Sequence, residues 1–360
     1  MATRTGGDTI RYGIIGSGMM GGEHMLVLEH VPNAEVVAIA DPVESSLDWG
    51  RACTFPDVWT TTNYLDLLAR DDLDAVVIST PNFTHINVLD DALATDLAVL
   101  IEKPMCTTVD DCKTVVARAA DREALTWVGL QYRYMPTVAT TLERLSTGVC
   151  GTTRMVSIRE HRFPFLKKVN DWNRFSANTG GTLVEKCCHF FDLMRVVAGA
   201  DPERVYASGG QDVNHLDEFY DGKRSDILDN AFVIIDFENG VRGMLDLSMF
   251  AEGGRFEQEI TITGDRAKLE TTVHGNRVFL GPRDHSGVQT IEAPMQEDVP
   301  HPDFHQGASY IEHLHFGECL RAGTQPTVTV TDGMWAVAMG AAAHRSIDEG
   351  RPVRIDEFAL

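Results

Sequence analysis

The first third of the chain alternates short apolar runs with longer amphipathic stretches. The apolar runs are Ile10–Ile15, Glu35–Ala40, Ala75–Ser79, Ala98–Ile101 and Thr126–Gly129. Their branched side chains and short lengths are typical of buried strands. Helical segments such as Tyr64–Ala69 and Thr84–Thr95 lie between them. Strands that alternate with helices indicate parallel βαβ units, so we predict one doubly wound parallel sheet over residues 9–131.

A different pattern begins after Gln131. It opens with a helix over Pro136–Thr147, a strand over Thr152–Glu160 and a helix over Leu183–Ala198. Strand-like runs follow at Ala231–Phe237, Arg242–Met249, Gln258–Thr263, Lys268–Thr272 and Arg277–Leu280. Short turns between them predict an antiparallel meander. We expect a surface loop over residues 281–308, then two closing helices over 309–322 and 332–349. The prediction for residues 132–360 is therefore an α+β domain with a large, mostly antiparallel open sheet.

Composition supports two folded domains and excludes several partners. The chain has 360 residues, of which 43% are hydrophobic, and a formal net charge of −22. A field of that sign repels nucleic acid and anionic membranes. No apolar run approaches the roughly 20 residues of a membrane span, and the polar N-terminus does not resemble a secretion signal. Seven cysteines without regular spacing argue against a disulfide framework. We expect a cytoplasmic protein.

A glycine motif follows the first predicted strand. Gly16, Ser17, Gly18, Met19, Met20 and Gly21 form G-x-G-x-x-G just before a predicted helix. The three glycines permit a tight turn, close approach of a pyrophosphate and close packing of the helix. Asp41 ends the second strand, where a carboxylate binds the ribose hydroxyls and repels a 2′-phosphate. The pattern predicts a Rossmann domain that binds NAD rather than NADP, and the alternative is an ordinary turn beside a solvated Asp.

Two further strand ends carry candidate cofactor residues. Thr80, Pro81, Asn82 and His85 follow the third long strand, and Glu102 and Lys103 follow the next. Ligands bind at the carboxyl edge of such sheets. A structural alternative for Asn82 is the N-cap of the following helix.

Three polar residues stand out on the apolar helix over Leu183–Ala198. Glu185, His189 and Asp192 are spaced by four and three residues, which places them on one narrow stripe. Burial of such groups is costly unless they face partners or a polar cleft. Gly180–Thr182 provides a flexible entry and an N-cap. We predict a stripe that lines a cleft, and the alternative is a satisfied core histidine with two solvated carboxylates.

The chain resembles the glucose-fructose oxidoreductase / inositol dehydrogenase superfamily from Arg11 to about Val353. The resemblance is carried by GIIGSGMMG (Gly13–Gly21), STPNFTH (Ser79–His85), EKP (Glu102–Pro104) and GGTLVEKCCHFFD (Gly180–Asp192). It implies that Lys103 polarises the substrate hydroxyl and that His189 is the general base. It also implies that Asp192 binds a neighbouring hydroxyl and that Arg133 lies on the substrate side.

One departure from this pattern concerns the residues before the histidine. Inositol dehydrogenases usually have Asp four residues before the histidine, whereas this chain has Glu185, followed by Lys186. Glu185 can still pair with His189 across one helical turn. Lys186 is expected to add a cation beside the site or to pair with Glu102.

A basic segment at residues 151–175 suggests a binding site for an anionic group. Its basic residues are Arg154, Arg159, Arg162, Lys167, Lys168 and Arg174, against only Glu160 and Asp171. In so acidic a chain, this excess suggests a carboxylate, sulfonate or phosphate on the substrate. His161, Trp172 and Asn173 are candidates for shaping a sugar pocket. The alternative is a solvated strand edge protected by charge.

Three functions compete at this point. The first is NAD-dependent hydride transfer at a secondary hydroxyl of a sugar, sugar acid or cyclitol. The second is a redox-neutral glycosidase that uses NAD transiently, for example on a sulfoquinovoside. The third, a non-catalytic NAD-binding regulator, would need neither Lys103 nor His189. No metal is expected, because the histidines at 301, 305, 313 and 315 lack a frame of further ligands. The meander sheet and the family resemblance predict a homodimer or homotetramer.

Overall fold

The computed structural model describes residues 6–55, 57–295 and 299–360, which form two compact units. Within these ranges the first unit holds residues 6–106, 110–131 and 299–334, and the second holds 107–109, 132–295 and 335–360. The sequence prediction had placed residues 299–334 in the second domain. Their helix α10 instead packs on α1 of the first unit, because its buried face contains Phe316 and His313, which contact the ring of Tyr12.

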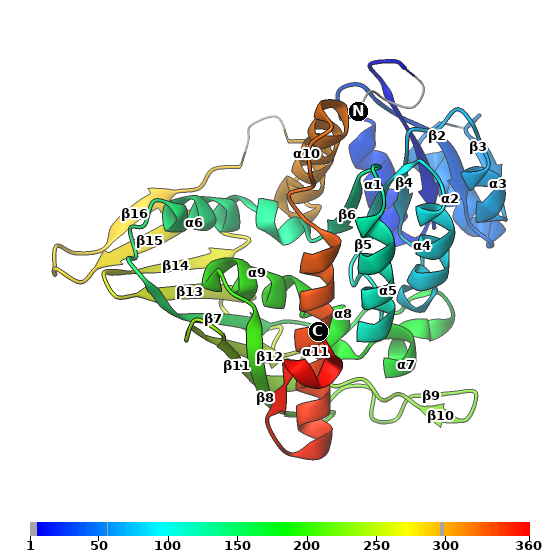
Figure 1. The fold of residues 1–360 in the computed structure, drawn as a ribbon. Coiled ribbons are helices and arrows are strands. Elements are labelled where there is room, and N and C mark those ends of the chain that lie inside the picture. Colours follow the sequence, from blue (N-terminus) through cyan, green and yellow to red (C-terminus); the bar gives the residue numbers. More distant parts are fainter. Residues whose placement is uncertain (1–5, 56, 296–298) are drawn as a thin grey trace. The chain divides into compact units, whose positions relative to one another are not determined.

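The first unit is built on a six-stranded, wholly parallel sheet in the order β3-β2-β1-β4-β5-β6 (Figure 1). Its strands are β1 (Ile10–Ile15), β2 (Ala34–Ala40), β3 (Trp59–Thr61), β4 (Ala75–Ile78), β5 (Ala98–Glu102) and β6 (Thr126–Gly129). Its helices are α1 (Met19–Leu28), α2 (Glu44–Cys53), α3 (Tyr64–Leu68), α4 (His85–Leu93), most of α5 (Val109–Ala120), and α10 (Ala308–Ala322). This strand order confirms the doubly wound fold. The strand order reverses between β1 and β4, where such sheets bind ligands.

The second unit contains a nine-stranded sheet in the order β16-β15-β14-β13-β7-β12-β11-β8-β17. Only β7 and β12 run parallel, so the predicted open, mostly antiparallel sheet is confirmed. Its strands are β7 (Thr153–His161), β8 (Pro202–Gly210), β11 (Asn230–Phe237), β12 (Arg242–Ser248), β13 (Gln258–Gly264), β14 (Ala267–Val273), β15 (Arg277–Pro282), β16 (Gln289–Glu292) and β17 (Val353–Arg354). A separate hairpin joins β9 (Phe219–Tyr220) and β10 (Lys223–Arg224).

Helices cover one face of the large sheet. They include α6 (Pro136–Ser146), which packs on β14 and β15, and α9 (Cys188–Ala198), which packs on β7 and β12. In β11, Val233 and Ile235 are buried toward that side, whereas Phe232 and Ile234 alternate onto the other face and are exposed. The remaining helices are α7 (Ser176–Thr179), α8 (Thr182–Glu185) and α11 (Val330–Glu349), which runs from one unit into the other. In the described ranges no helix has the length and apolarity needed to cross a membrane.

The structure corrects three local predictions. The helix expected over residues 183–198 is broken into α8 and α9 at Cys187, whose ψ of −3° departs from the usual helical value of about −42°. Its N-cap is Gly181, while the hydroxyl of Thr182 donates to the carbonyl of Leu228. The loop expected over residues 281–308 contains β16, which pairs with β15, and residues 296–298 of that expected loop lie outside the described residues.

Short 3₁₀ turns complete the chain. They are η1 (Asn82–Thr84), η2 (Gln131–Tyr134), η3 (Val169–Arg174), η4 (His305–Gly307) and η5 (Ile355–Phe358). Asn82 therefore begins a turn of its own, and the N-cap of α4 is Thr84.

Candidate active site

The glycine motif forms a tight loop between β1 and α1. Gly16 has a φ of +94°, and a Cβ there would lie 2.8 Å from the backbone of Ser79 and Thr80. A Cβ on Gly21 would lie 2.1 Å from the carbonyl oxygen of Gly16. Gly18 differs, since a Cβ there would meet nothing within 4 Å. Packing thus requires the first and third glycines, while the second leaves open space beside the helix N-terminus.

Asp41 lies against this loop. Its Oδ2 accepts a hydrogen bond from the backbone N–H of Ser17 (2.9 Å), and its Oδ1 accepts one from Val43 (2.9 Å). No side chain caps the N-terminus of α1, and Met19 at its first position is 57% exposed. Free N–H groups at a helix start are a favourable place for a phosphate. The loop and Asp41 therefore fit a dinucleotide, with the carboxylate in position for ribose hydroxyls.

The side chain of His85 contacts the segments that follow β4 and β5, the two other predicted strand ends. Its Nδ1 lies 2.8 Å from the carbonyl oxygen of Pro104, and its Nε2 lies 2.9 Å from that of Thr80. Burial lowers the pKa of His85, although the carbonyl contacts oppose the shift. Asn82 is buried, and its Nδ2 donates no hydrogen bond within the described ranges. An unmatched buried donor at this edge is consistent with a polar ligand.

A chain of buried groups lies behind Lys103. Oε2 of Glu102 accepts the backbone N–H of Lys103 (3.0 Å), and Oε1 lies 3.0 Å from Nε2 of His24. Nδ1 of His24 lies 2.9 Å from Nε2 of His313. Burial raises the pKa of Glu102, but the hydrogen bond and charge of His24 outweigh it and the net shift is downward. Burial and the neighbouring His24 hold the pKa of His313 far below its usual value.

An ionised Glu102 can accept a hydrogen bond from Nε2–H of His24. Nδ1 of His313 is buried and has no hydrogen-bond partner in the described structure. Sequence reasoning missed His24, because one histidine on an apolar helix carries no signal of its partner. His305 contacts Glu23 instead (2.9 Å), and no cluster of three potential metal ligands occurs in the described residues.

In the second unit, Arg133 and Asp192 form a two-pronged ion pair. Nε and Nη2 of Arg133 lie 2.7 and 2.5 Å from the two carboxylate oxygens of Asp192. Asp192 is buried, and Arg133 is 13% exposed at its side chain. Such planar pairing fixes both groups in orientation. The two residues that the family resemblance placed on the substrate side are thus brought together.

His189 is buried on α9 beside an aromatic residue that the sequence analysis did not select. Its ring stacks on Tyr132, with centroids 4.2 Å apart and planes at 9°. Glu185 is also buried, at the end of α8. Lys186 pairs with Glu160, with Nζ and Oε1 3.0 Å apart, rather than with Glu102 as expected. The reason is that β7, beneath α9, carries a fully buried carboxylate that needs a cation.

The basic segment divides into groups with different surroundings. Arg162 shares Glu160 with Lys186, at 3.6 Å. Arg174 is 2% exposed and already contacts Glu218 (3.0 Å) and the carbonyl of Phe165 (3.1 Å). Its guanidinium holds the segment together internally, because a buried cation requires such partners, so Arg174 is occupied by contacts within the protein and not by the substrate anion that the sequence suggested.

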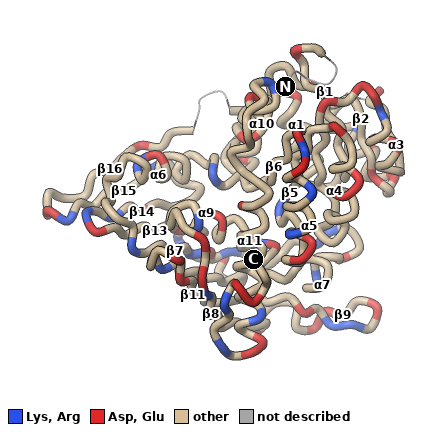
Figure 2. The backbone as a smooth tube through the Cα atoms, in the orientation of Figure 1, with Lys and Arg blue, Asp and Glu red and all other residues tan. Residues whose placement is uncertain are grey.

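The other segment residues are placed as follows. Lys167 is exposed and lies 4.0 Å from Asp171, and Lys168 is half-buried. His161 contacts Asp246 (3.0 Å), while buried Asn173 donates to the carbonyl of Leu166 (2.9 Å). Trp172 is half-buried, and its carbonyl accepts from Asn178. Figure 2 shows that acidic residues are interspersed with the basic ones throughout both units.

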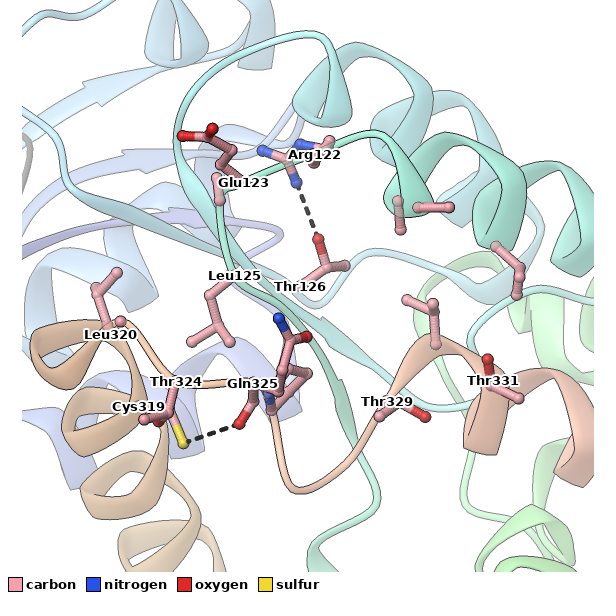
Figure 3. Close-up of a pocket in the computed structure, with 17 residues that line it drawn as sticks. Arg122, Glu123, Leu125, Thr126, Cys319, Leu320, Thr324, Gln325, Thr329 and Thr331 are labelled. Atoms are coloured by element: carbon pink, nitrogen blue, oxygen red, sulfur yellow. Dashed lines mark hydrogen bonds between the residues drawn. The ribbon is translucent and has the colours of Figure 1, made fainter. Parts of the chain in front are cut away.

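A separate cavity of about 310 Å³ in the first unit lies away from this chemistry. It is lined by the C-terminal end of α5, the start of β6 and the end of α10, and two of its lining residues, Arg122 and Thr126, are joined by a hydrogen bond (2.9 Å) (Figure 3). Thr126 begins β6, so the cavity lies at the amino end of the parallel strands. The glycine loop lies at their carboxyl end, where ligands bind.

The chain matches two protein-family models, one in each half. Residues 10–130 match the family model "Oxidoreductase family, NAD-binding Rossmann fold", and residues 143–355 match "Oxidoreductase family, C-terminal alpha/beta domain". Scyllo-inositol 2-dehydrogenase (NAD(+)) of Bacillus subtilis is 25% identical, with 96% of each chain covered. A 2,7-anhydro-N-acetylneuraminate hydratase of Mediterraneibacter gnavus is 23% identical, with 97% of this chain and 98% of the relative covered.

Solved structures show the same fold. Levoglucosan dehydrogenase, in complex with NADH and levoglucosan, superposes with a TM-score of 0.84 at 19% identity, covering 96% of this chain and 99% of the other. Together the two family models cover both structural units, and the glycine loop with Asp41 fits their NAD-binding description. The chain belongs to the GFO_IDH_MocA oxidoreductase family, with an N-terminal NAD-binding Rossmann domain and the family's C-terminal α/β domain.

Proposed function

We propose that the protein transfers a hydride between NAD and a secondary hydroxyl of a sugar, sugar acid or cyclitol. The observation that carries the proposal is the buried polar group on α9, where His189 stacks on Tyr132 and Asp192 is paired with Arg133. Burying polar groups on an apolar helix is costly unless they have hydrogen-bonding or charged partners, which a bound substrate can provide. Relatives named as dehydrogenases of inositol support a substrate with several hydroxyls.

Each residue has a distinct proposed role. Bound NAD supplies the hydride acceptor, held by the glycine loop and Asp41. His189 removes the hydroxyl proton, and a histidine suits this because its ordinary pKa lies near working pH. Glu185 orients His189, and Lys103 polarises the hydroxyl oxygen. Asp192, fixed by Arg133, accepts a hydrogen bond from a neighbouring hydroxyl.

A redox-neutral glycosidase is the second candidate. In that reaction oxidation of a ring hydroxyl acidifies the adjacent C–H, elimination and hydration follow, and the ketone is reduced again. The supporting observation is that two cations, Lys186 and Arg162, gather at the buried carboxylate of Glu160, and a cluster of cations suits an anionic glycoside such as a sulfoquinovoside. One relative is named as a hydratase of 2,7-anhydro-N-acetylneuraminate, and this name also supports a reaction other than net oxidation.

One screen separates the two candidates. The protein is incubated with NAD and a panel of sugars, sugar acids, cyclitols and their aryl glycosides. Both NADH absorbance and release of the aryl group are recorded. A dehydrogenase accumulates NADH in proportion to product, whereas the glycosidase releases the aryl group without net NADH. If no compound of the panel gives NADH or releases the aryl group at any concentration, both candidate functions are contradicted.

We expect NAD to bind more tightly than NADP. The carboxylate of Asp41 is held at the glycine loop by the N–H of Ser17 and repels a 2′-phosphate. Calorimetric titration of both cofactors checks this, and Asp41→Ala is expected to weaken NAD and relax the preference. Asp57→Ala, an exposed acid of the same unit, serves as the control. Tighter binding of NADP to the unmodified protein would contradict the prediction.

We expect acidic sugars to be better substrates than neutral sugars of the same stereochemistry. The candidate contacts are Arg162, Lys167 and Lys168, with Lys186 behind Arg162. Arg162→Ala should reduce the preference for the acidic sugar, measured as a ratio of kcat/KM values. Arg154→Ala, an exposed change at the start of β7, should leave the ratio in place. Equal efficiency on acidic and neutral sugars would favour the solvated-edge interpretation.

We expect a dimer or tetramer that associates through the uncovered face of the large sheet. Phe232, Ile234, Met244 and Met155 are exposed there, by 63, 48, 42 and 56%, and clustered apolar surface of this kind marks an interaction site. Light scattering at micromolar concentration should give a multiple of 39.7 kDa. Phe232→Glu should shift it toward the monomer, whereas Val213→Glu, exposed outside the strands, should not. A monomeric unmodified protein would contradict the prediction.

A further inference from the structure

Tyr132 is placed to control the orientation of His189. The two rings are nearly parallel, with planes at 9° and centroids 4.2 Å apart. Tyr132 is 4% exposed and His189 2% exposed, so water does not compete for this contact. Phe190 packs edge-on against the same phenol ring, at 5.7 Å and 70°. The imidazole of His189 therefore stacks on the face of the Tyr132 ring, and Phe190 packs against that ring from its side.

The oxygen of Tyr132 is fixed by two donors from different elements. Nζ of Lys186 lies 3.3 Å from it, and Nε2 of Gln258 on β13 lies 3.1 Å from it. Lys186 is in turn held by Glu160 on β7. Burial lowers the pKa of Lys186, but the charge and hydrogen bond of Glu160 together with Tyr132 outweigh it, and the net shift is upward. The phenol is thus held at its oxygen by a charged lysine and by an amide.

The polar contacts of Tyr132 are not needed merely to fill the core beside His189. A phenylalanine would fill the same volume without requiring a buried lysine, glutamate and glutamine around it, and buried polar networks are costly unless every member is satisfied. A general base must present its nitrogen in a defined direction to the proton that it removes. Stacking restricts rotation of the imidazole about its side-chain bonds.

We propose that Tyr132 is a positioning residue for His189, held at its hydroxyl by Lys186 and Gln258, so that the phenol ring sets the plane of the imidazole. The role rests on the proposed function of His189 as general base. Neither Tyr132 nor its anchors Lys186 and Gln258 need touch the substrate for this role.

The first test requires no substrate. Histidine-labelled protein is studied by NMR, and the signals of His189 are identified by their loss in His189→Ala. Protons above an aromatic face are shielded, so Tyr132→Leu should move the His189 ring protons downfield, while Tyr132→Phe should keep most of the shielding. Phe190→Leu removes a buried ring of the same cluster without removing the stacked one and is the matched control. Unchanged His189 signals in Tyr132→Leu would overturn the proposal.

The second test is a double-mutant cycle on the best substrate of the sugar screen. Tyr132→Leu should lower kcat by about 10²-fold, the loss typical of a displaced catalytic group, with KM for NAD near normal. In the His189→Ala background the same change should have almost no further effect. Tyr132→Phe should recover part of the loss. Equal losses in both backgrounds would overturn the positioning role, whereas full turnover of His189→Ala alone would overturn the proposed function instead.

Discussion

Replacing His189 by Ala is expected to lower turnover by about 10²–10⁴-fold, the usual loss when a positioned base is removed. A secondary alcohol is a very weak acid, so its hydride leaves readily only if its proton is removed in step. NAD binding should stay near normal, because the residues proposed to hold NAD all belong to the first unit and His189 belongs to the second. Turnover on the best substrate and calorimetric titration of NAD measure the two effects separately.

Lys103→Ala provides the companion measurement. We expect a comparable loss of turnover, since the hydroxyl oxygen loses its positive donor. The double variant should lose much less than the product of the two single losses, because groups that act on one proton transfer are not additive. Lys113→Ala, a half-exposed lysine paired with Asp110, is the control for loss of a positive charge. Near-normal turnover in either single variant would refute the mechanism while leaving the fold unaffected.

Lys186→Met is expected to lower the free energy of unfolding by about 3–5 kcal/mol, the cost of leaving a buried charge without its main partner. Glu160 has no exposed side-chain surface, and Arg162, at 3.6 Å, is its remaining cation. Urea denaturation followed by circular dichroism measures the change. Here the expected loss is in stability, which distinguishes it from the catalytic variants.

Adding Glu160→Gln should restore much of that stability. The double variant has no buried charge to compensate, and replacing both partners of a buried pair is often close to neutral. Arg204→Met, which breaks an exposed pair with Asp236, should cost no more than about 1 kcal/mol. If the losses from Lys186→Met and Glu160→Gln simply add, the two side chains do not stabilise one another and the described pair is not the source of the effect.

The sequence alone was sufficient for much of the first unit. Short branched runs between amphipathic stretches predicted its long strands. The regular layout of one βαβ unit explains why the glycine loop and Asp41 were found, although Ser17 and Asp41 are 24 residues apart. The turn, the helix start and the strand end of such a unit carry their chemistry in residue type and spacing. The basic segment was also visible in sequence, but whether a cation binds a substrate or a neighbouring side chain was not. Arg174 shows the difference, since its partner Glu218 comes from a distant part of the chain.

What the sequence determined by itself is the parallel fold and the dinucleotide motif. One stripe of Glu185, His189 and Asp192 stays a prediction, because the helix that was expected to carry all three is broken between α8 and α9. Tertiary structure alone decided which distant side chains meet these residues. Periodicity shows that a helix has a buried face, but it does not show which strand or loop that face packs against. The pairing of Lys186 with Glu160, the stacking of Tyr132 on His189 and the contact of His24 with Glu102 therefore follow from packing between elements far apart in the chain.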